Sequence, residues 1–153
     1  MIAVHRQGGP AMKIQAVLID GFKNLSNVRI RLDNITALVA LNNFGKSNVL
    51  TAIDFGLDFM KASLEDKASM MSNSKLMPIN RHMFGKNYKF EMDILTEFDS
   101  REYRVIYGYE FAWSRDEDSD PYIVSEFLKI RPEDKGQKYT QLIRRSNQSA
   151  FYK

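Results

Sequence analysis

The sequence contains no cysteine and only two histidines among its 153 residues. Disulfide bonds and zinc sites built on cysteine thiolates are therefore excluded, as is a histidine-rich metal centre. No apolar run approaches the length that spans a membrane, and the first residues lack the apolar core of a secretory signal. We therefore expect a cytoplasmic protein with no membrane partner.

The charge imbalance is small. Lys and Arg number 22 against 19 Asp and Glu, so the formal net charge is +3. This excess is too small to indicate a nucleic-acid partner by itself. Hydrophobic residues make up 44% and charged residues 27% of the chain, which is typical of a globular domain. A chain of this length can bury a core as a single domain.

The first eleven residues form a leader or tag-like segment that we exclude from the fold. Gly8-Gly9-Pro10 interrupts any regular structure. Met12 begins the first clean periodic segment, and we expect the folded domain to cover residues 12–153.

The most informative stretch runs from Ile35 to Leu50. Residues 35–40 form a continuous apolar run, which is typical of a central strand. A tight loop then ends in Gly-Lys-Ser, and Ser47 opens a helix. A strand, a loop and a helix in this order build a phosphate-binding loop, because main-chain N–H groups and the positive end of the helix dipole meet the phosphate charges.

The loop matches most of the pattern G-x-x-x-x-G-K-[ST]. Gly45, Lys46 and Ser47 agree with it, whereas Ala40 stands at the first glycine position. Glycine usually frees the tight turn there, so Ala40 fits only with a negative φ. The alternative interpretation is an ordinary strand–turn–helix corner with a solvated lysine.

The pattern assigns a role to each residue type. We expect the ammonium group of Lys46 at the β- and γ-phosphates of a nucleotide, and the hydroxyl of Ser47 on Mg²⁺. Asn43 and Gly45 supply loop backbone, and Asn42 holds the loop shape. The candidate nucleotide-binding residues are Ala40, Asn42, Asn43, Phe44, Gly45, Lys46, Ser47 and Asn48.

Periodicity predicts the surrounding elements. Residues 13–19 and 27–32 read as strands, with a hairpin turn at Asp33-Asn34 leading into the strand at 35–40. The helix after Ser47 has small residues at Ala52 and Gly56 that allow close approach to a sheet. Its predicted apolar stripe consists of Val49, Leu50, Ile53, Leu57 and Met60.

The second half of the chain has a different hydrophobic pattern from the first half. Residues 63–88 form an irregular or helical connection, and from residue 89 the hydrophobic period is two. We expect antiparallel strands over 89–98, 103–113, 122–131 and 138–145, with a hairpin turn at Asp99-Ser100. The aromatic row in the second of these strands is interpreted as core, with a base-stacking platform as the alternative.

Three stretches resemble the N-terminal part of the ABC-type AAA ATPases related to RecF and SMC proteins and to OLD-family nucleases. They are Gly21-Phe22-Lys23-Asn24, the loop Asn42–Asn48, and Leu50-Thr51-Ala52-Ile53-Asp54-Phe55. The resemblance implies an α/β fold: a P-loop NTPase lobe of strand, P-loop and helix (12–62) with an antiparallel β-subdomain (89–153). It also implies ATP and Mg²⁺ binding, a homodimer or the remainder of a longer ATPase chain as partner, and often work on DNA or in phage defence.

The hydrolytic half of such an ATPase is missing from the sequence. No run of four apolar residues is followed by Asp-Glu, the Walker B pattern that holds Mg²⁺ and positions water, and we identify no catalytic residue. We therefore expect ATP hydrolysis only when a Walker B and signature half completes the site. The alternatives are a non-catalytic protein- or DNA-interaction module with a vestigial loop and, with less support, a small nucleotide kinase.

Overall fold

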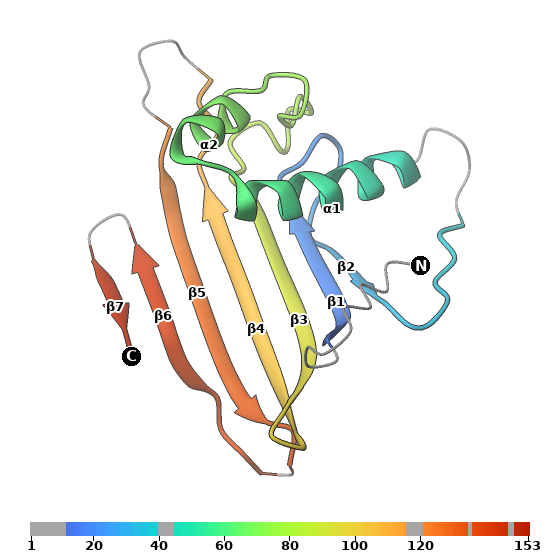
Figure 1. Ribbon diagram of the computed structural model, residues 1–153. Helices are drawn as coiled ribbons and strands as arrows, with labels where there is room; N and C mark the ends of the chain where they lie inside the picture. Colours follow the sequence, from blue (N-terminus) through green and yellow to red (C-terminus); the bar gives the residue numbers. More distant parts are fainter. Residues whose placement is uncertain (1–11, 40–44, 116–120, 135, 147–148) are drawn as a thin grey trace.

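The computed structural model describes residues 12–39, 45–115, 121–134, 136–146 and 149–153 (Figure 1). The candidate site residues Ala40, Asn42, Asn43 and Phe44 lie outside this description, as does the leader 1–11. The described chain forms seven strands and two helices: β1 (Met12–Asp20), β2 (Val28–Arg31), α1 (Lys46–Lys61), α2 (Leu64–Met71), β3 (Tyr88–Phe98), β4 (Arg101–Phe111), β5 (Ile123–Pro132), β6 (Thr140–Ser146) and β7 (Ala150–Tyr152).

All seven strands belong to one antiparallel sheet in the order β2-β1-β3-β4-β5-β6-β7. The predicted antiparallel strands are confirmed, and β7 is an additional one that the sequence pattern did not indicate. The turn between β3 and β4 lies at Asp99 and Ser100, whose φ angles are 49° and 60°. Two successive positive φ angles suit the right-handed twist of a tight hairpin, so this predicted turn is also confirmed.

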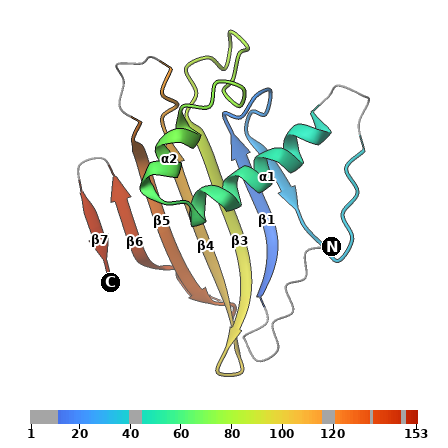
Figure 2. The same ribbon diagram turned by 45° about the horizontal axis from the view of Figure 1, so that its top comes forward.

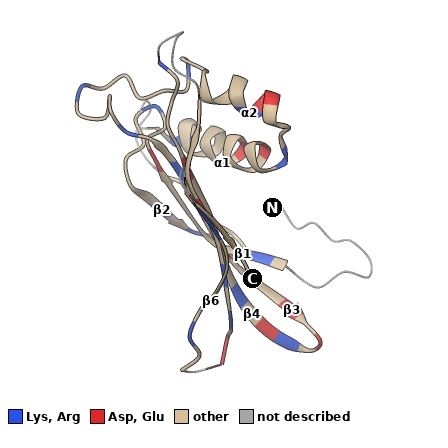
Figure 3. Cartoon of the chain, turned by 90° about the vertical axis from the view of Figure 1, so that its left-hand side faces the viewer, with Lys and Arg blue, Asp and Glu red and all other residues tan. Residues whose placement is uncertain are grey.

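Both helices lie on the same side of the sheet (Figure 3). They cross the strands near one end, so the other half of this face carries no helix in the described chain (Figures 1 and 2). Half-buried apolar side chains occupy that half, among them Ile94, Val105 and Ile130, which are paired across β3, β4 and β5. The structure thus has a packed half and an open half on one face.

The buried face of α1 agrees with the predicted stripe in part, since Ile53, Leu57 and Met60 pack against the core although they are only partly buried. Val49, Ala52, Phe55, Gly56 and Phe59 are its buried residues. By contrast, Leu50, which the prediction placed in the stripe, is 58% exposed. The prediction counted aliphatic positions and left out the two phenylalanines, which carry the largest apolar surface of the helix and therefore decide its orientation.

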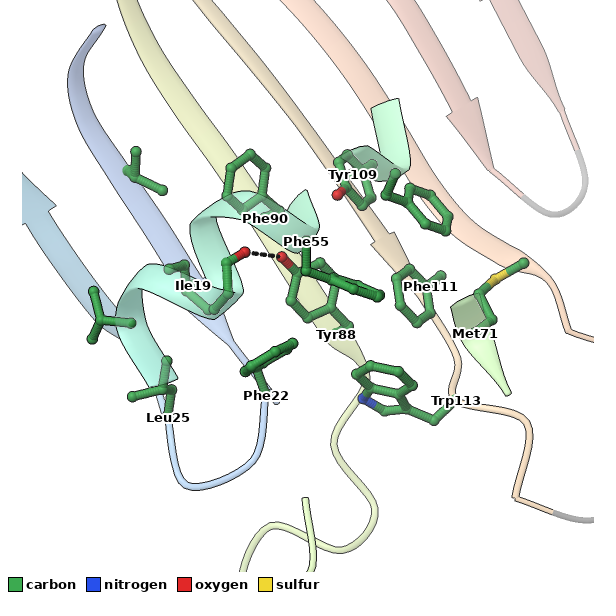
Figure 4. Packing of buried hydrophobic residues seen from close by; sticks show 14 of the residues in the cluster. Ile19, Phe22, Leu25, Phe55, Met71, Tyr88, Phe90, Tyr109, Phe111 and Trp113 are labelled. Carbon is green, nitrogen blue, oxygen red and sulfur yellow. Dashed lines mark hydrogen bonds between the residues drawn. The ribbon is translucent and has the colours of Figure 1, made fainter. Parts of the chain in front are cut away.

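An aromatic cluster fixes α1 on the sheet (Figure 4). The ring of Phe55 meets Tyr88 edge-on at 5.2 Å between centroids, and Phe59 stacks on Tyr109 at 4.9 Å and on Phe111 at 4.8 Å. Such pairs add to the free energy of burial because the ring quadrupoles are complementary. The core interpretation of the β4 aromatic row is thereby confirmed at its buried end.

Two tyrosine hydroxyls tie the sheet to the helix backbone. Tyr88 donates to the carbonyl of Ala52 at 3.1 Å, and Tyr109 donates to the carbonyl of Gly56 at 2.9 Å. Burial raises the pKa of both tyrosines well above the usual value, so both remain protonated donors. These bonds satisfy phenolic hydroxyls that would otherwise be costly inside an apolar core.

The predicted strand over residues 35–40 is wrong for residues 35–39, which are neither strand nor buried. Ile35 is 86% exposed and Val39 is 92% exposed. A strand needs a paired neighbour, and in the described chain the sheet ends on this side at β2. The segment is apolar and rich in β-branched residues, but nothing in the described residues pairs with it. For the same reason, Asp33-Asn34 does not form the predicted hairpin turn.

Charged residues form a ladder on the sheet face opposite the helices. Asp93 lies between Arg29, at 3.7 Å, and Arg104, at 3.2 Å. Glu133 continues the ladder to Arg104, at 3.6 Å, and to Arg131, at 3.0 Å. Alternation along the strands separates this charged face from the apolar face that packs under α1.

The turn between β1 and β2 is held by an ion pair. Lys86 contacts both carboxylate oxygens of Asp20, at 2.8 and 2.9 Å, and also reaches the hydroxyl of Ser26 at 2.9 Å. The main-chain N–H groups of Gly21 and Asn27 donate to the same carboxylate, each at 2.9 Å. One side chain therefore closes both ends of the turn and joins it to the segment before β3.

At Gly56, the space between α1 and β3 is too small for a side chain. A Cβ added there would lie 2.5 Å from the ring of Phe90, which is fully buried. Helix propensity alone favours Gly56→Ala by about 1 kcal/mol. Because the ring cannot withdraw, we expect overpacking to outweigh this gain and to destabilise the protein by about 1–2 kcal/mol, measured by urea unfolding.

The matched control is Asp54→Ala, an exposed position of the same helix, which should change the free energy of unfolding by no more than about 0.5 kcal/mol. If Gly56→Ala were as stable as the wild type or more so, the close approach of α1 to β3 would be contradicted.

The Asp20 carboxylate should make stability depend on pH. Burial raises the pKa of Asp20, but the hydrogen bond from Lys86, the charge of Lys86 and the two main-chain donors outweigh burial and hold this pKa below its usual value. The stabilisation is then present above the unfolded-state value, about 3.9, and is lost as pH falls through the lower folded value. We expect Asp20→Asn to cost about 1–2 kcal/mol at pH 7.

This cost should shrink as pH falls from about 4 through the lower folded-state pKa of Asp20, below which the folded wild type loses the charge as well. Urea unfolding at a series of pH values measures the difference, with Asp54→Asn as an exposed carboxylate control. A difference between wild type and Asp20→Asn that stayed constant down to pH 2 would contradict the ion pair.

Candidate functional site

The described part of the candidate loop is the start of α1. Gly45 is the residue before the first helical turn, and Lys46, Ser47 and Asn48 form that turn. The carbonyl of Gly45 accepts the first helical hydrogen bond, from the N–H of Val49 at 3.0 Å. The predicted helix after Gly45 is therefore confirmed, and it begins at Lys46, one residue before the predicted Ser47.

Gly45 has a backbone conformation that favours glycine. Its φ is +96° and its ψ is 8°, in the left-handed region where a Cβ is strained. The space is also restricted, because an added Cβ would lie 3.0 Å from the side-chain nitrogen of Asn24. Gly45 thus lets the chain turn sharply into α1 and leaves room for the side chain of Asn24.

The first turn of α1 carries no carboxylate. Its residues are Lys46, Ser47, Asn48 and Val49, and the preceding Gly45 offers no side-chain cap. The start of α2 shows the contrast: the hydroxyl of Ser63 accepts from the N–H of Asp66 at 3.1 Å, and Glu65 and Asp66 neutralise the dipole. The sequence itself therefore supplies negative charge at the start of α2 and none at the start of α1. A helix N-terminus without its own acidic side chains, such as that of α1, is suited to an external anion.

Asn24 is the residue that sequence reasoning missed. Its side-chain oxygen accepts a hydrogen bond from the side-chain nitrogen of Asn48 at 2.8 Å, across 24 residues of sequence. The motif Gly21-Phe22-Lys23-Asn24 served in the sequence only to recognise a resemblance. Nothing in its spacing shows that Asn24 meets Gly45 and Asn48, because that contact depends on how the turn after β1 folds back toward α1.

The donor set fits Mg²⁺ only in part. Ser47 is exposed at the start of α1, and its hydroxyl is the kind of oxygen that Mg²⁺ accepts beside phosphates. In the part of the chain that the structure describes, no group of three His, Cys, Asp or Glu side chains could hold a metal ion. A magnesium ion here would therefore depend on phosphate oxygens and water for most of its ligands.

Neither α1 nor α2 is long and apolar enough to cross a membrane.

Comparison with known proteins identifies the family. No curated protein matches the chain. A family model described as the AAA ATPase domain matches residues 12–151, from the first residue of β1 into β7. The match includes the candidate loop, both helices and the antiparallel sheet as far as residue 151 in β7. Members of such a family bind nucleotides, typically with Mg²⁺. The chain therefore belongs to the AAA ATPase domain family.

Proposed function

We propose that this chain is the ATP-binding N-terminal lobe of a larger ABC-type ATPase. Residues 40–48 would form its phosphate loop, with the ammonium group of Lys46 at the outer phosphates and the hydroxyl of Ser47 on Mg²⁺. The main-chain N–H groups at the start of α1 would meet the remaining phosphate oxygens. Bound ATP would supply the negative phosphate charge that these donors bind, and its triphosphate is what an ATPase hydrolyses.

One observation carries the proposal: the AAA ATPase domain match over residues 12–151 includes Gly45, Lys46 and Ser47, which stand at the start of α1. The left-handed φ of Gly45 and the absence of acid in the first helical turn support it, since both are expected of an anion-binding helix start. The contact of Asn24 with Asn48 adds a second element beside the loop.

The finer assignments follow from the resemblance to RecF- and SMC-type ATPases and OLD-family nucleases. On this basis the ATP cycle would serve work on DNA or phage defence, and the partner would be a second copy or the remainder of a longer ATPase chain. The sequence has no Walker B pattern, so hydrolysis would need that half of the site.

A second candidate function is a non-catalytic module that binds a protein or DNA and whose loop is vestigial. Two observations favour it: Ala40 replaces the first glycine of the motif, and residues 35–39 do not form the strand that normally leads into such a loop. This alternative and the proposal differ in one property, nucleotide binding that depends on Lys46.

Lys46→Ala should abolish stabilisation by ATP with Mg²⁺. At a ligand concentration of 100 times the dissociation constant, the wild type should gain about 2.7 kcal/mol, and the variant should gain little, because the charge at the outer phosphates is gone. Thermal unfolding with and without ATP measures this gain for both proteins.

Lys61→Ala is the matched control, because Lys61 is an exposed lysine in the last turn of the same helix. It should keep the full ATP shift. Equal shifts in wild type and Lys46→Ala would reject the phosphate loop, and no shift in either protein would favour the non-catalytic module.

The chain alone should bind ATP without turning it over. Release of inorganic phosphate from ATP and Mg²⁺ should equal that of Lys46→Ala within error, because no carboxylate of the Walker B pattern positions water. Phosphate release by the wild type well above that of Lys46→Ala would show that these 153 residues already contain a complete hydrolytic site.

A further inference from the structure

The side chain of Asn24 occupies the position where the turn after β1 meets the start of α1. Its oxygen accepts from the side-chain nitrogen of Asn48 at 2.8 Å. Its nitrogen and oxygen would lie 3.0 and 3.2 Å from a Cβ added to Gly45. One carboxamide therefore accepts a hydrogen bond from the first turn of the helix and fills the space that a Cβ at Gly45 would need.

The turn that carries Asn24 is fixed from several directions. Phe22 is fully buried and Leu25 is 5% exposed, so the turn is anchored on both sides of Asn24. The N–H of Lys23 donates to the carbonyl of Leu76 at 2.9 Å, and the indole N–H of Trp113 donates to the carbonyl of Gly21 at 2.9 Å. Hydrogen bonds from two distant parts of the chain, at Leu76 and Trp113, thus hold this turn.

The same turn contains two non-glycine residues with positive φ angles, a backbone conformation that chain reversal alone does not require. Lys23, directly before Asn24, has a φ of 47°, and Asn27 has a φ of 50°. A lysine in the left-handed region costs free energy that the surrounding contacts must offset. The strained backbone is therefore paired with a side chain that reaches the candidate loop.

We propose that Asn24 is a positioning residue for nucleotide binding. It holds Gly45 and the first turn of α1 in place before a nucleoside triphosphate arrives, through its hydrogen bond to Asn48 and by filling the space beside Gly45 that a Cβ would need. Preorganisation raises affinity because less order has to be created on binding. This inference rests on the proposed function and adds to it a residue outside the Gly-Lys-Ser motif.

The test is a double-mutant cycle read out as the dissociation constant for ATP with Mg²⁺. Asn24→Ala and Asn48→Ala each remove the same hydrogen bond, so each should weaken binding about 5- to 10-fold. Because the bond is shared, the double variant should bind about as weakly as the weaker single variant. The thermal midpoint without nucleotide should stay close to that of the wild type for Asn24→Ala, since Asn24 is exposed.

Asn27→Gly is the matched control in the same turn. It removes an exposed asparagine side chain, and glycine accepts the positive φ of this position. It should leave the dissociation constant unchanged. If Asn24→Ala failed to fold, Asn48→Ala would test the same bond from the helix side.

The outcomes separate the two proposals. Non-additive losses in Asn24→Ala and Asn48→Ala, with Asn27→Gly unchanged, support the positioning role. If the wild type binds ATP and Asn24→Ala binds equally well, or if the two losses simply add, the positioning role is overturned and the proposed function stands. If the wild type binds no nucleotide, both fall.

Discussion

The structure depends on the packing of α1 against the middle of the sheet. Phe55 and Phe59 place their rings on Tyr88, Tyr109 and Phe111, and this aromatic contact is the centre of the buried cluster. The two tyrosine hydroxyls add hydrogen bonds to helix carbonyls. Because these contacts fix the axis of α1, they also fix where its first turn points.

A second constraint places the other side of the site. The ion pair of Asp20 with Lys86 closes the turn after β1, and the buried ring of Phe22 anchors it in the same core that receives Phe55, at 5.6 Å between the two ring centroids. The turn and the helix are thus both anchored in the same hydrophobic core. They meet at the hydrogen bond between Asn24 and Asn48 beside Gly45, within the span that the AAA ATPase domain model matches.

Periodicity was sufficient to predict the elements whose partners are close in sequence. The strands β3 to β6 alternate with a period of two and pair with their neighbours in the chain, so their pattern and their turns indicated the sheet. The start of α1 followed from Gly45-Lys46-Ser47, and the close approach at Gly56 followed from its lack of a side chain.

The failures have physical causes. Residues 35–39 read as a central strand because an apolar, β-branched run is typical of one, but strand formation depends on a paired neighbour that the run itself does not encode. The predicted apolar stripe of α1 was wrong at Leu50 and left out Phe55 and Phe59, because it did not weigh the larger apolar surface of the phenylalanine rings. Asn24 was missed because a contact across 24 residues depends on tertiary structure.

The most direct test of the account is a nuclear magnetic resonance titration of the isotope-labelled chain with ATP and Mg²⁺. The account predicts that the largest shift changes fall on the main-chain N–H groups of residues 45–48 and on the side-chain amides of Asn24 and Asn48. The β3–β4 hairpin at Asp99 and Ser100, at the far end of the sheet (Figure 1), should not respond. Unchanged signals at residues 45–48, or the largest changes at that hairpin, would contradict it.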